Sequence, residues 1–162
     1  MNTFYLWRVK HIQHRHFVLL LSLIVGLLSG LAAVVIKNSV HFIQGLLASG
    51  FTKNYHNYLY FIFPLVGLFL TVILIKYVIR RPVGHGIPGV LYAISKKNSI
   101  IKSFGIYASV ITSALTVGFG GSVGLEGPTV STGGSLGSNL GRFFKLDYKT
   151  TTLLIGCGAV GA

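Results

Sequence analysis

Long uncharged stretches alternate with short basic segments along this chain. Residues 17–36 and 58–75 contain no charged side chain, and residues 103–141 contain a single one. A helix needs about 20 apolar residues to cross the hydrocarbon core of a bilayer, so each of the first two stretches is long enough for one crossing. The third stretch is long enough for a crossing and a further, more complicated element.

These stretches predict a helix over residues 17 to about 48, a second crossing over 58–80 and a third hydrophobic helix over 103–118. Arg81-Pro82 is expected to end the second crossing, because a residue before proline disfavours the helical conformation. Ile87-Pro88 then opens a piece of only about eight to ten residues, which is too short to span. The expected fold is an all-α integral membrane protein with partly broken helices.

Glycine interrupts the third stretch. Residues 118–127 contain five glycines, and each glycine lowers the stability of a helix. Irregular backbone at membrane depth is tolerated only where it is buried in protein or lines a water-filled cavity. Pro128 is expected to restart a helix. One face of that helix carries glycines four residues apart, which favours tight packing on a neighbouring helix: Gly133, Gly137 and Gly141.

Composition supports a membrane location and argues against a nucleic-acid-binding protein. Apolar residues make up 52% of the chain and charged residues only 10%, whereas charged residues form roughly 25% of an average soluble domain. The net charge of +12 does not indicate a nucleic-acid partner, because the basic residues flank the hydrophobic runs and form no continuous stripe.

The basic residues also predict a topology. The positive-inside rule places residues 1–16 in the cytoplasm, residues 37–57 outside and residues 76–102 back in the cytoplasm. We therefore divide the chain into a basic, interfacial N-terminal segment, 1–16, and a transmembrane part, 17–162. The expected location is the plasma membrane, or the inner membrane of a bacterium, with several crossings.

Metal, disulfide and cofactor chemistry is not expected. Cys157 is the single cysteine, which excludes an intrachain disulfide and a thiolate metal cluster. Asp147 lies between Lys145 and Lys149 and is interpreted as a surface counter-ion. Three histidines near the N-terminus are interpreted as solvated side chains: His11, His14 and His16.

Two loops of the same design carry the candidate chemistry. Gly84-His-Gly-Ile-Pro88 and Gly124-Leu-Glu-Gly-Pro128 each place a glycine loop directly before a proline at a predicted helix start. A helix N-terminus bears roughly half a positive charge and free N–H donors, and glycine leaves the backbone exposed to a ligand. Two such starts converging in a membrane form an anion site that binds weakly enough to release its ion. The alternative is that the glycines only permit tight helix crossing.

Glu126 is the sharpest single candidate, because an acidic side chain at membrane depth costs several kcal/mol and marks a functional site by default. Nearby N–H donors favour its charged form and the low dielectric favours its protonated form, so it can switch. The alternative is a helix-capping acid. His85, in the matching loop, is a candidate anion donor or a vestibule residue without a role.

In this order, the two loops resemble signatures of the CLC family of chloride channels and anion/proton antiporters. Gly86-Ile87-Pro88 is similar to the end of the family's Gly-Ser-Gly-Ile-Pro motif, and residues 124–130 resemble its Gly-Arg/Lys-Glu-Gly-Pro motif. Gly133-Gly134 and residues 152–162 are also similar to the family. The resemblance covers residues 15–162 and implies a CLC-type bundle of tilted, partly broken helices.

The resemblance also implies roles for single residues. Glu126 matches the gating glutamate, whose carboxylate competes with the anion and relays protons in the antiporters. His85 matches a serine that contacts the central anion. The path from this half would be lined by the N–H groups of Gly86, Ile87, Glu126 and Gly127. A homodimer with one anion path in each subunit is implied, with chloride as the anion and, in an antiporter, protons as partners.

The chain departs from the family at three points. His85 replaces serine, which puts chloride preference over nitrate or fluoride in doubt. Leu125 replaces a basic residue, which weakens the external field that attracts anions. The family's second half is missing after Ala162, so we expect a truncated chain that does not conduct alone and whose form, channel or antiporter, is open. Other classes remain: a membrane enzyme using Glu126 as an acid/base, or a packing scaffold without ion flux.

Overall fold

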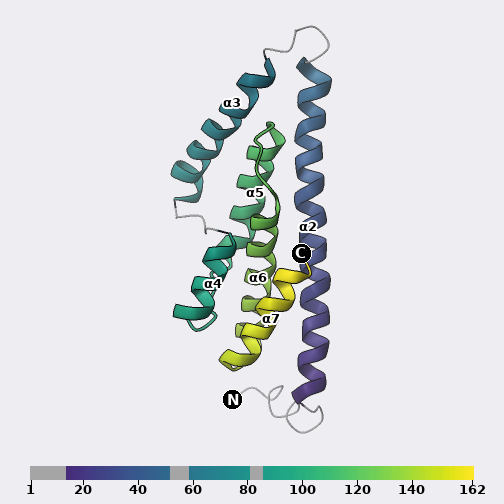
Figure 1. Ribbon diagram of the computed structural model, residues 1–162, viewed down its shortest axis with the longest axis vertical. Coiled ribbons are helices and arrows are strands. Elements are labelled where there is room, and N and C mark those ends of the chain that lie inside the picture. The colour runs from purple at the N-terminus through teal and green to yellow at the C-terminus, as the bar shows by residue number, and fades with distance from the viewer. Residues whose placement is uncertain (1–13, 52–58, 81–85) are drawn as a thin grey trace.

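The computed structural model describes residues 14–51, 59–80 and 86–162. These residues form helices joined by short connections and contain no strand, so the prediction of an all-α fold is confirmed. Figure 1 shows tilted helices of unequal length beside one long helix. In chain order the helices are α2 (His14–Phe51), α3 (Leu59–Ile73), the π-helix η1 (Leu74–Ile79), α4 (Ile87–Lys96), α5 (Phe104–Gly118), α6 (Glu126–Phe143) and α7 (Tyr148–Val160).

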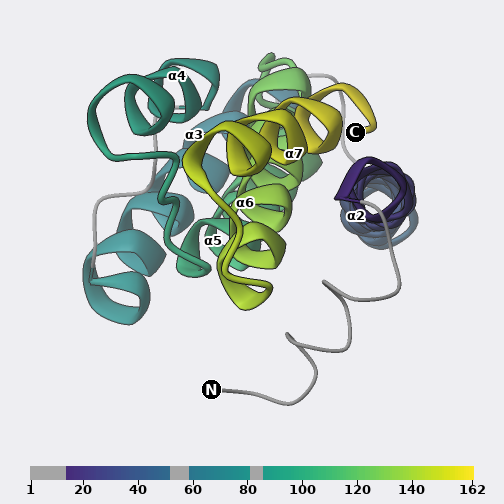
Figure 2. The same ribbon diagram turned by 90° about the horizontal axis from the view of Figure 1, so that it is seen from below.

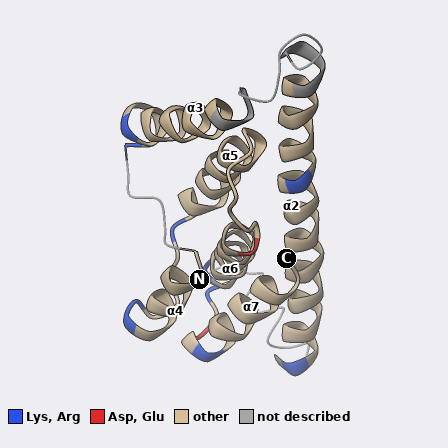
Figure 3. Cartoon of the chain, turned by 45° about the horizontal axis from the view of Figure 1, so that its top comes forward, with Lys and Arg blue, Asp and Glu red and all other residues tan. Residues whose placement is uncertain are grey.

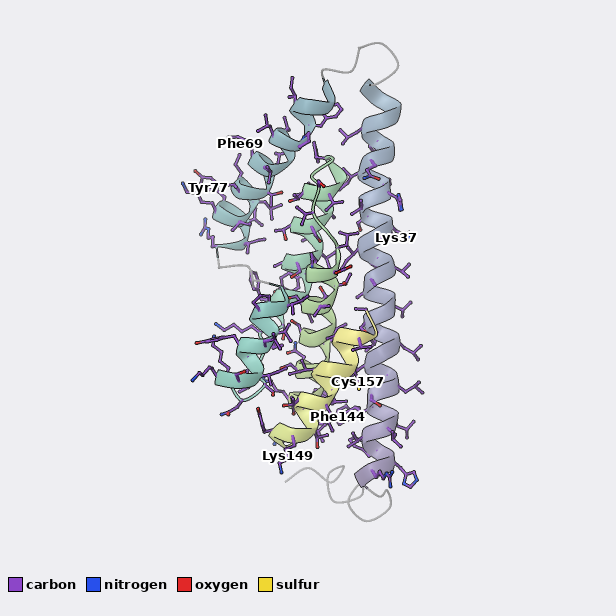
Figure 4. The ribbon with its side chains drawn as sticks, viewed as in Figure 1. Lys37, Phe69, Tyr77, Phe144, Lys149 and Cys157 are labelled. Atoms are coloured by element: carbon purple, nitrogen blue, oxygen red, sulfur yellow. The ribbon has the colours of Figure 1, made fainter. Side chains whose placement is uncertain are left out.

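Two of these helices are long and apolar enough to cross a membrane. The candidate spans are Arg15–Leu47 within α2 and Ile62–Ile79, which joins α3 and η1, with mean hydropathies of 2.7 and 2.4. Only 22% and 11% of the residues in their apolar windows are buried, so neither is the core helix of a soluble domain. Figure 4 shows Phe69 and Tyr77, both more than half exposed, pointing away from the bundle. Such large exposed apolar faces are typical of surfaces that meet lipid.

The sequence predicted one regular helix for the second crossing, but the structure differs. The crossing is α-helical to Ile73 and then widens into the π-helix η1, which ends when Arg80 adopts a positive φ of 50°. The backbone N–H of Arg80 donates to the carbonyl of Ile75 at 2.8 Å, a π-type bond that closes the last turn. α2 also extends beyond both predicted ends, and its 38 residues correspond to about 57 Å. The polar loop expected after α2 falls largely on residues 52–58, which are outside the described residues.

The helix α6 is the centre of the bundle. It contacts α2, α4, α5 and α7, and Figures 1 and 2 show α5, α6 and α7 side by side with α2 standing at one flank. Its sequence is rich in glycine, serine and threonine, and eight of its residues are buried. Small residues suit this position, because helices inside a membrane associate by close backbone packing and not by the hydrophobic effect.

Glycines bring α6 and α7 into backbone contact. A Cβ atom added at Gly133 would overlap the carbonyl oxygen of Gly158, and one added at Gly158 would overlap the carbonyl oxygen of Gly133. A Cβ at Gly137 would meet the backbone of Leu154 in the same way. One turn further, a Cβ at Gly141 would lie 2.8 Å from the hydroxyl oxygen of Thr151. The glycine face of α6 is therefore the face on which α7 packs.

The long helix α2 closes the flank of this pair. Gly161, just after α7, lies against Ser29 and Gly26, so a Cβ there would lie 2.7 Å from the Ser29 hydroxyl. A small apolar core of Leu21, Val25 and Leu154 joins α2 to α7. Other aromatic and aliphatic side chains pack around this core, including Phe17 of α2, Leu140 of α6 and Phe144 just after α6.

The helix α3 packs on α5 from the opposite side. Gly67 lies directly under the Phe119 side chain, and any Cβ at this position would collide with it. The Thr71 hydroxyl donates to the Gly67 carbonyl at 2.8 Å and lies 3.2 Å from the Thr116 hydroxyl. These contacts tie α3 to the centre of the bundle.

The α6–α7 contact predicts a strong difference between two glycines of α7. We expect Gly158→Ala to destabilise the protein by about 1–3 kcal/mol or more, because the added methyl group forces two backbones apart. Thermal unfolding in detergent, followed by size-exclusion chromatography of the surviving fraction, measures the effect.

Gly156→Ala is the matched control on the same helix. Gly156 is exposed and a Cβ there has nothing within 4 Å. We expect this variant to be neutral or to stabilise the helix by about 0.5–1 kcal/mol. Equal losses of stability in the two variants would contradict the proposed reason for the glycine contact.

Candidate functional site

The start of α4 is built by Gly86. This residue is the N-cap and has a φ of +61°, a conformation that residues with a side chain rarely adopt. Its carbonyl accepts the Val90 N–H at 3.2 Å, and Pro88 occupies the first turn. The first N–H groups of a helix have no partner inside it, so those of Ile87 and Gly89 are free of the helix ladder. Gly84 and His85, the other predicted residues of this loop, lie outside the described residues.

The start of α6 is built by residues 125–129. Leu125 is the N-cap, and Glu126 and Gly127 are the first helical residues. The sequence predicted that this helix begins at Pro128, but it begins two residues earlier, at Glu126. Proline is tolerated here because its missing N–H belongs to the first turn, where it would have no helical partner. The Leu125 carbonyl accepts the Thr129 N–H at 3.0 Å, and the Glu126 carbonyl accepts the Thr129 hydroxyl at 2.9 Å.

The two helix starts meet. A Cβ atom added at Gly86 would lie 3.3 Å from the Cα of Gly127 and 3.5 Å from its carbonyl oxygen. Two segments that are far apart in the sequence therefore touch through two glycines, backbone against backbone. The structure thus brings together four residues that were predicted to line one path: Gly86, Ile87, Glu126 and Gly127.

Glu126 directly precedes Gly127 at this meeting point. Its side chain is exposed and has neither a hydrogen bond nor an ion pair within the described part of the chain. Figure 3 shows red at the start of α6, the helix whose first turn contains Glu126. It is one of only two acidic residues in the sequence.

Electrostatics at the meeting point come from the backbone. Residues 86–95 and 103–141 contain no lysine or arginine, so the segments that converge carry no full positive charge. Two helix N-termini supply partial positive charges of roughly one half each, together with N–H donors. This arrangement suits an anion that must bind and leave, and it equally suits a carboxylate that occupies the same place.

Packing holds α4 and α6 in this register. Val90, one turn into α4, lies against Gly134, where an added Cβ would be 3.3 Å from the valine Cγ1. Behind α4, the connection to α5 is held by Ser138 of α6. The Ser138 hydroxyl donates to the Ser99 carbonyl at 2.6 Å and accepts the Ile101 N–H at 2.9 Å.

Two structural contacts near the site and at α7 were missed by the sequence analysis. Nothing in the local pattern marks Ser138, because its partners lie in a distant turn. Asp147 was interpreted as a surface counter-ion, but it also has a structural role. It is the N-cap residue of α7, and its carboxylate accepts a hydrogen bond from the Thr150 hydroxyl. The sequence did contain a signal for this position, since aspartate is one of the residues preferred directly before a helix.

The remaining candidates are placed as follows. Gly124 lies in the irregular segment before α6 with open space around it. Cys157 is half-buried and free. Residues 14–51, 59–80 and 86–162 contain no group of three or more histidine, cysteine or acidic side chains that would hold a metal ion.

Comparison with known proteins gives one match. The family model described as voltage gated chloride channel matches residues 66–162, which is more than half of the chain. The matched region contains both loops and all helices from α4 to α7. No curated protein and no solved structure matches the chain.

The contact between the helix starts makes Gly86 a sensitive position. We expect Gly86→Ala to destabilise the protein by about 1–2 kcal/mol, because the positive φ becomes strained and the methyl group presses on Gly127. The matched control is Gly124→Ala in the other loop, where φ is not in the strained range and the space is open. Thermal unfolding of both variants measures the difference, and a Gly86→Ala variant as stable as its control would contradict the contact.

Proposed function

The chain belongs to the voltage gated chloride channel family, and we propose that it forms part of a transmembrane anion pathway gated by Glu126. Members of this family are channels or transporters and not enzymes. The proposed anion is chloride. The observation that carries the proposal is the contact between Gly86 and Gly127, which supports a shared site at two helix N-termini.

The backbone of Gly86, Ile87, Glu126 and Gly127 is proposed to bind the anion. N–H groups at two helix starts attract a negative ion without the tight binding that a lysine or an arginine would give. Desolvation of a small anion in a membrane is costly, and several convergent donors offset part of that cost. Gly84 and His85 are proposed to complete the site from the α4 side, with His85 as a side-chain donor to the anion.

Glu126 is proposed to act as the gate. As a carboxylate it competes with the anion for the same N–H donors, and as a neutral acid it vacates the site and carries a proton. Its place in the first turn of α6 and its freedom from any described partner support this role. The proposed function covers both a channel and an anion/proton antiporter, and nitrate and fluoride are the alternative anions because His85 and Leu125 depart from the family pattern.

The assembly and topology are part of the same proposal. We propose a homodimer with one path in each subunit, in the plasma membrane or a bacterial inner membrane, with the N-terminus in the cytoplasm. The distribution of charge supports this topology. The starts of α2 and α7 and the ends of α4 and α6 carry basic residues at the lower end of Figure 1, and such residues favour the cytoplasmic side.

The gating role predicts the effect of Glu126→Gln. Glutamine imitates the neutral acid but cannot ionise, so we expect raised anion flux at neutral pH and no dependence of flux on pH. Any proton movement coupled to the anion should be lost. Efflux of chloride from liposomes containing the whole protein, recorded at several pH values, measures all three.

Asp147→Asn is the matched control, because Asp147 is the other acidic residue of the chain and asparagine is an equally good helix cap. It should keep wild-type flux and pH dependence. Unchanged anion flux and unchanged proton coupling in Glu126→Gln would contradict the gating role. Turnover of a substrate without ion flux would indicate a membrane enzyme instead.

The proposed topology predicts that Lys37 faces the outside of the cell and that Lys96 faces the cytoplasm. In a Cys157→Ser background, Lys37→Cys should react with a membrane-impermeant maleimide added to intact cells. Lys96→Cys should react only after the cells are permeabilised. The reverse pattern would contradict a cytoplasmic N-terminus.

A further inference from the structure

A second candidate site lies at the far end of α4, away from the meeting point of the helix starts. Here a pocket of 620 Å³ opens between α4, the turn that follows it and the start of α5. We call it the α4–α5 pocket. It is lined among others by Tyr92, Lys97, Ile100, Ile101, Lys102 and Phe104. Its volume falls in the range of roughly 300–1,000 Å³ that is usual for pockets that bind small molecules.

The back wall of this pocket is fixed in place. Ser138 of α6 holds the turn through its two hydrogen bonds to Ser99 and Ile101. The Ser99 hydroxyl also lies 2.6 Å from the Thr152 hydroxyl of α7, and the Ser103 hydroxyl donates to the Asn139 side chain at 2.6 Å. The turn between α4 and α5 is therefore tied to both central helices, which gives the pocket a preformed shape.

The charges of the pocket are unbalanced. Lys97 and Lys102 line it, and neither has an ion-pair partner among the described residues. The ammonium group of Lys97 lies 5.4 Å from the centre of the Tyr92 ring, which holds it over the pocket wall. The first turn of α5 begins at the same place, and the positive end of its helix dipole adds partial positive charge. The pocket is thus complementary to a negative group.

The rest of the lining is apolar and open to the surroundings. Ile100 and Tyr92 are both about half exposed, at 47% and 56%. Phe104 packs edge-on against Tyr107, with ring centres 5.6 Å apart. A soluble anion would leave these side chains in contact with water, whereas a molecule with a negative head and a hydrocarbon tail would cover them.

The position of the pocket matches the polar surface of a bilayer. Lys96 ends α4 at the basic end of the bundle, where Figure 3 shows lysine and arginine gathered at several helix ends. Tyrosine is enriched at this depth of membrane proteins, and basic pockets between helices on the cytoplasmic side bind the headgroups of anionic lipids.

We propose that the α4–α5 pocket binds an anionic phospholipid of the adjacent leaflet. The ammonium groups of Lys97 and Lys102 donate to the headgroup phosphate, and an acyl chain lies along Ile100, Tyr92 and Phe104. This proposal depends on the location of the protein in a membrane and not on anion transport.

The experiment measures lipid retention by the whole protein in detergent, using native mass spectrometry with dioleoylphosphatidylglycerol as the probe. A lysine near an anionic lipid contributes about a fivefold gain in affinity. Lys97→Gln/Lys102→Gln should therefore weaken binding of this lipid about 25-fold, and each single variant about fivefold. Lys97→Arg/Lys102→Arg should retain the lipid, since it keeps both charges.

Lys96→Gln/Lys149→Gln is the matched control, because it removes two exposed lysines from the same end of the molecule without touching the pocket. It should bind the lipid nearly as well as the wild type, and all variants should elute as the wild type does in size-exclusion chromatography. If the two Lys→Gln double variants lose the lipid equally, the site is overturned.

Two further probes separate the alternatives. Dioleoylphosphatidylcholine, whose headgroup has no net charge, should be retained much less than the anionic lipid, and equal retention would overturn the charge argument. Inorganic phosphate should not displace the bound lipid, and displacement at millimolar concentration would indicate a site for free phosphate. If the anion flux fails to depend on Glu126 but lipid retention depends on Lys97 and Lys102, the proposed function falls and the lipid site stands.

Discussion

The contact on which this structure depends is the one between the backbones of α6 and α7. Gly133 and Gly158 face each other with no room for a side chain on either. Such closeness increases the number of van der Waals contacts, which supply much of the attraction between helices where no water is displaced. It also explains why the least apolar helix is the most enclosed one. A helix so rich in glycine, serine and threonine is stable here only because other helices surround it.

The enclosure of α6 has a consequence at its first turn. Because α7, α2 and α5 fix the helix from three sides, its N-terminus has little freedom of position. The start of α4 is brought to the same point by the packing of Val90 on Gly134 and by the hold of Ser138 on the turn behind α4. Gly86 and Gly127 then meet as a result of packing elsewhere. The polarity of the site follows from the direction of two helices and needs no charged side chain.

Much of this arrangement was predictable from the sequence, and the failures have physical reasons. The uncharged stretches predicted the helices, and glycine before proline predicted where α4 begins. The spacing of Gly133, Gly137 and Gly141 predicted a packing face but not the helix that packs on it. The partner residue Gly158 is distant in the chain, and α7 has no glycines at the same four-residue spacing. The π-helix η1 was missed because a widened turn has no hydrophobic period of its own. The bonds of Ser138 were missed because both of its partners lie in a turn between helices.

The glycine contacts also restrict how this sequence can vary. Glycine is the smallest residue, so a change at Gly133 or Gly158 can only add volume, and no replacement relieves a crowded backbone. The leucines on the outer face of α2 are different, because each can become larger or smaller while the face stays apolar. Two surfaces of one membrane protein therefore tolerate mutation very differently. Variation is expected to collect where lipid is the neighbour and to be scarce where another backbone is.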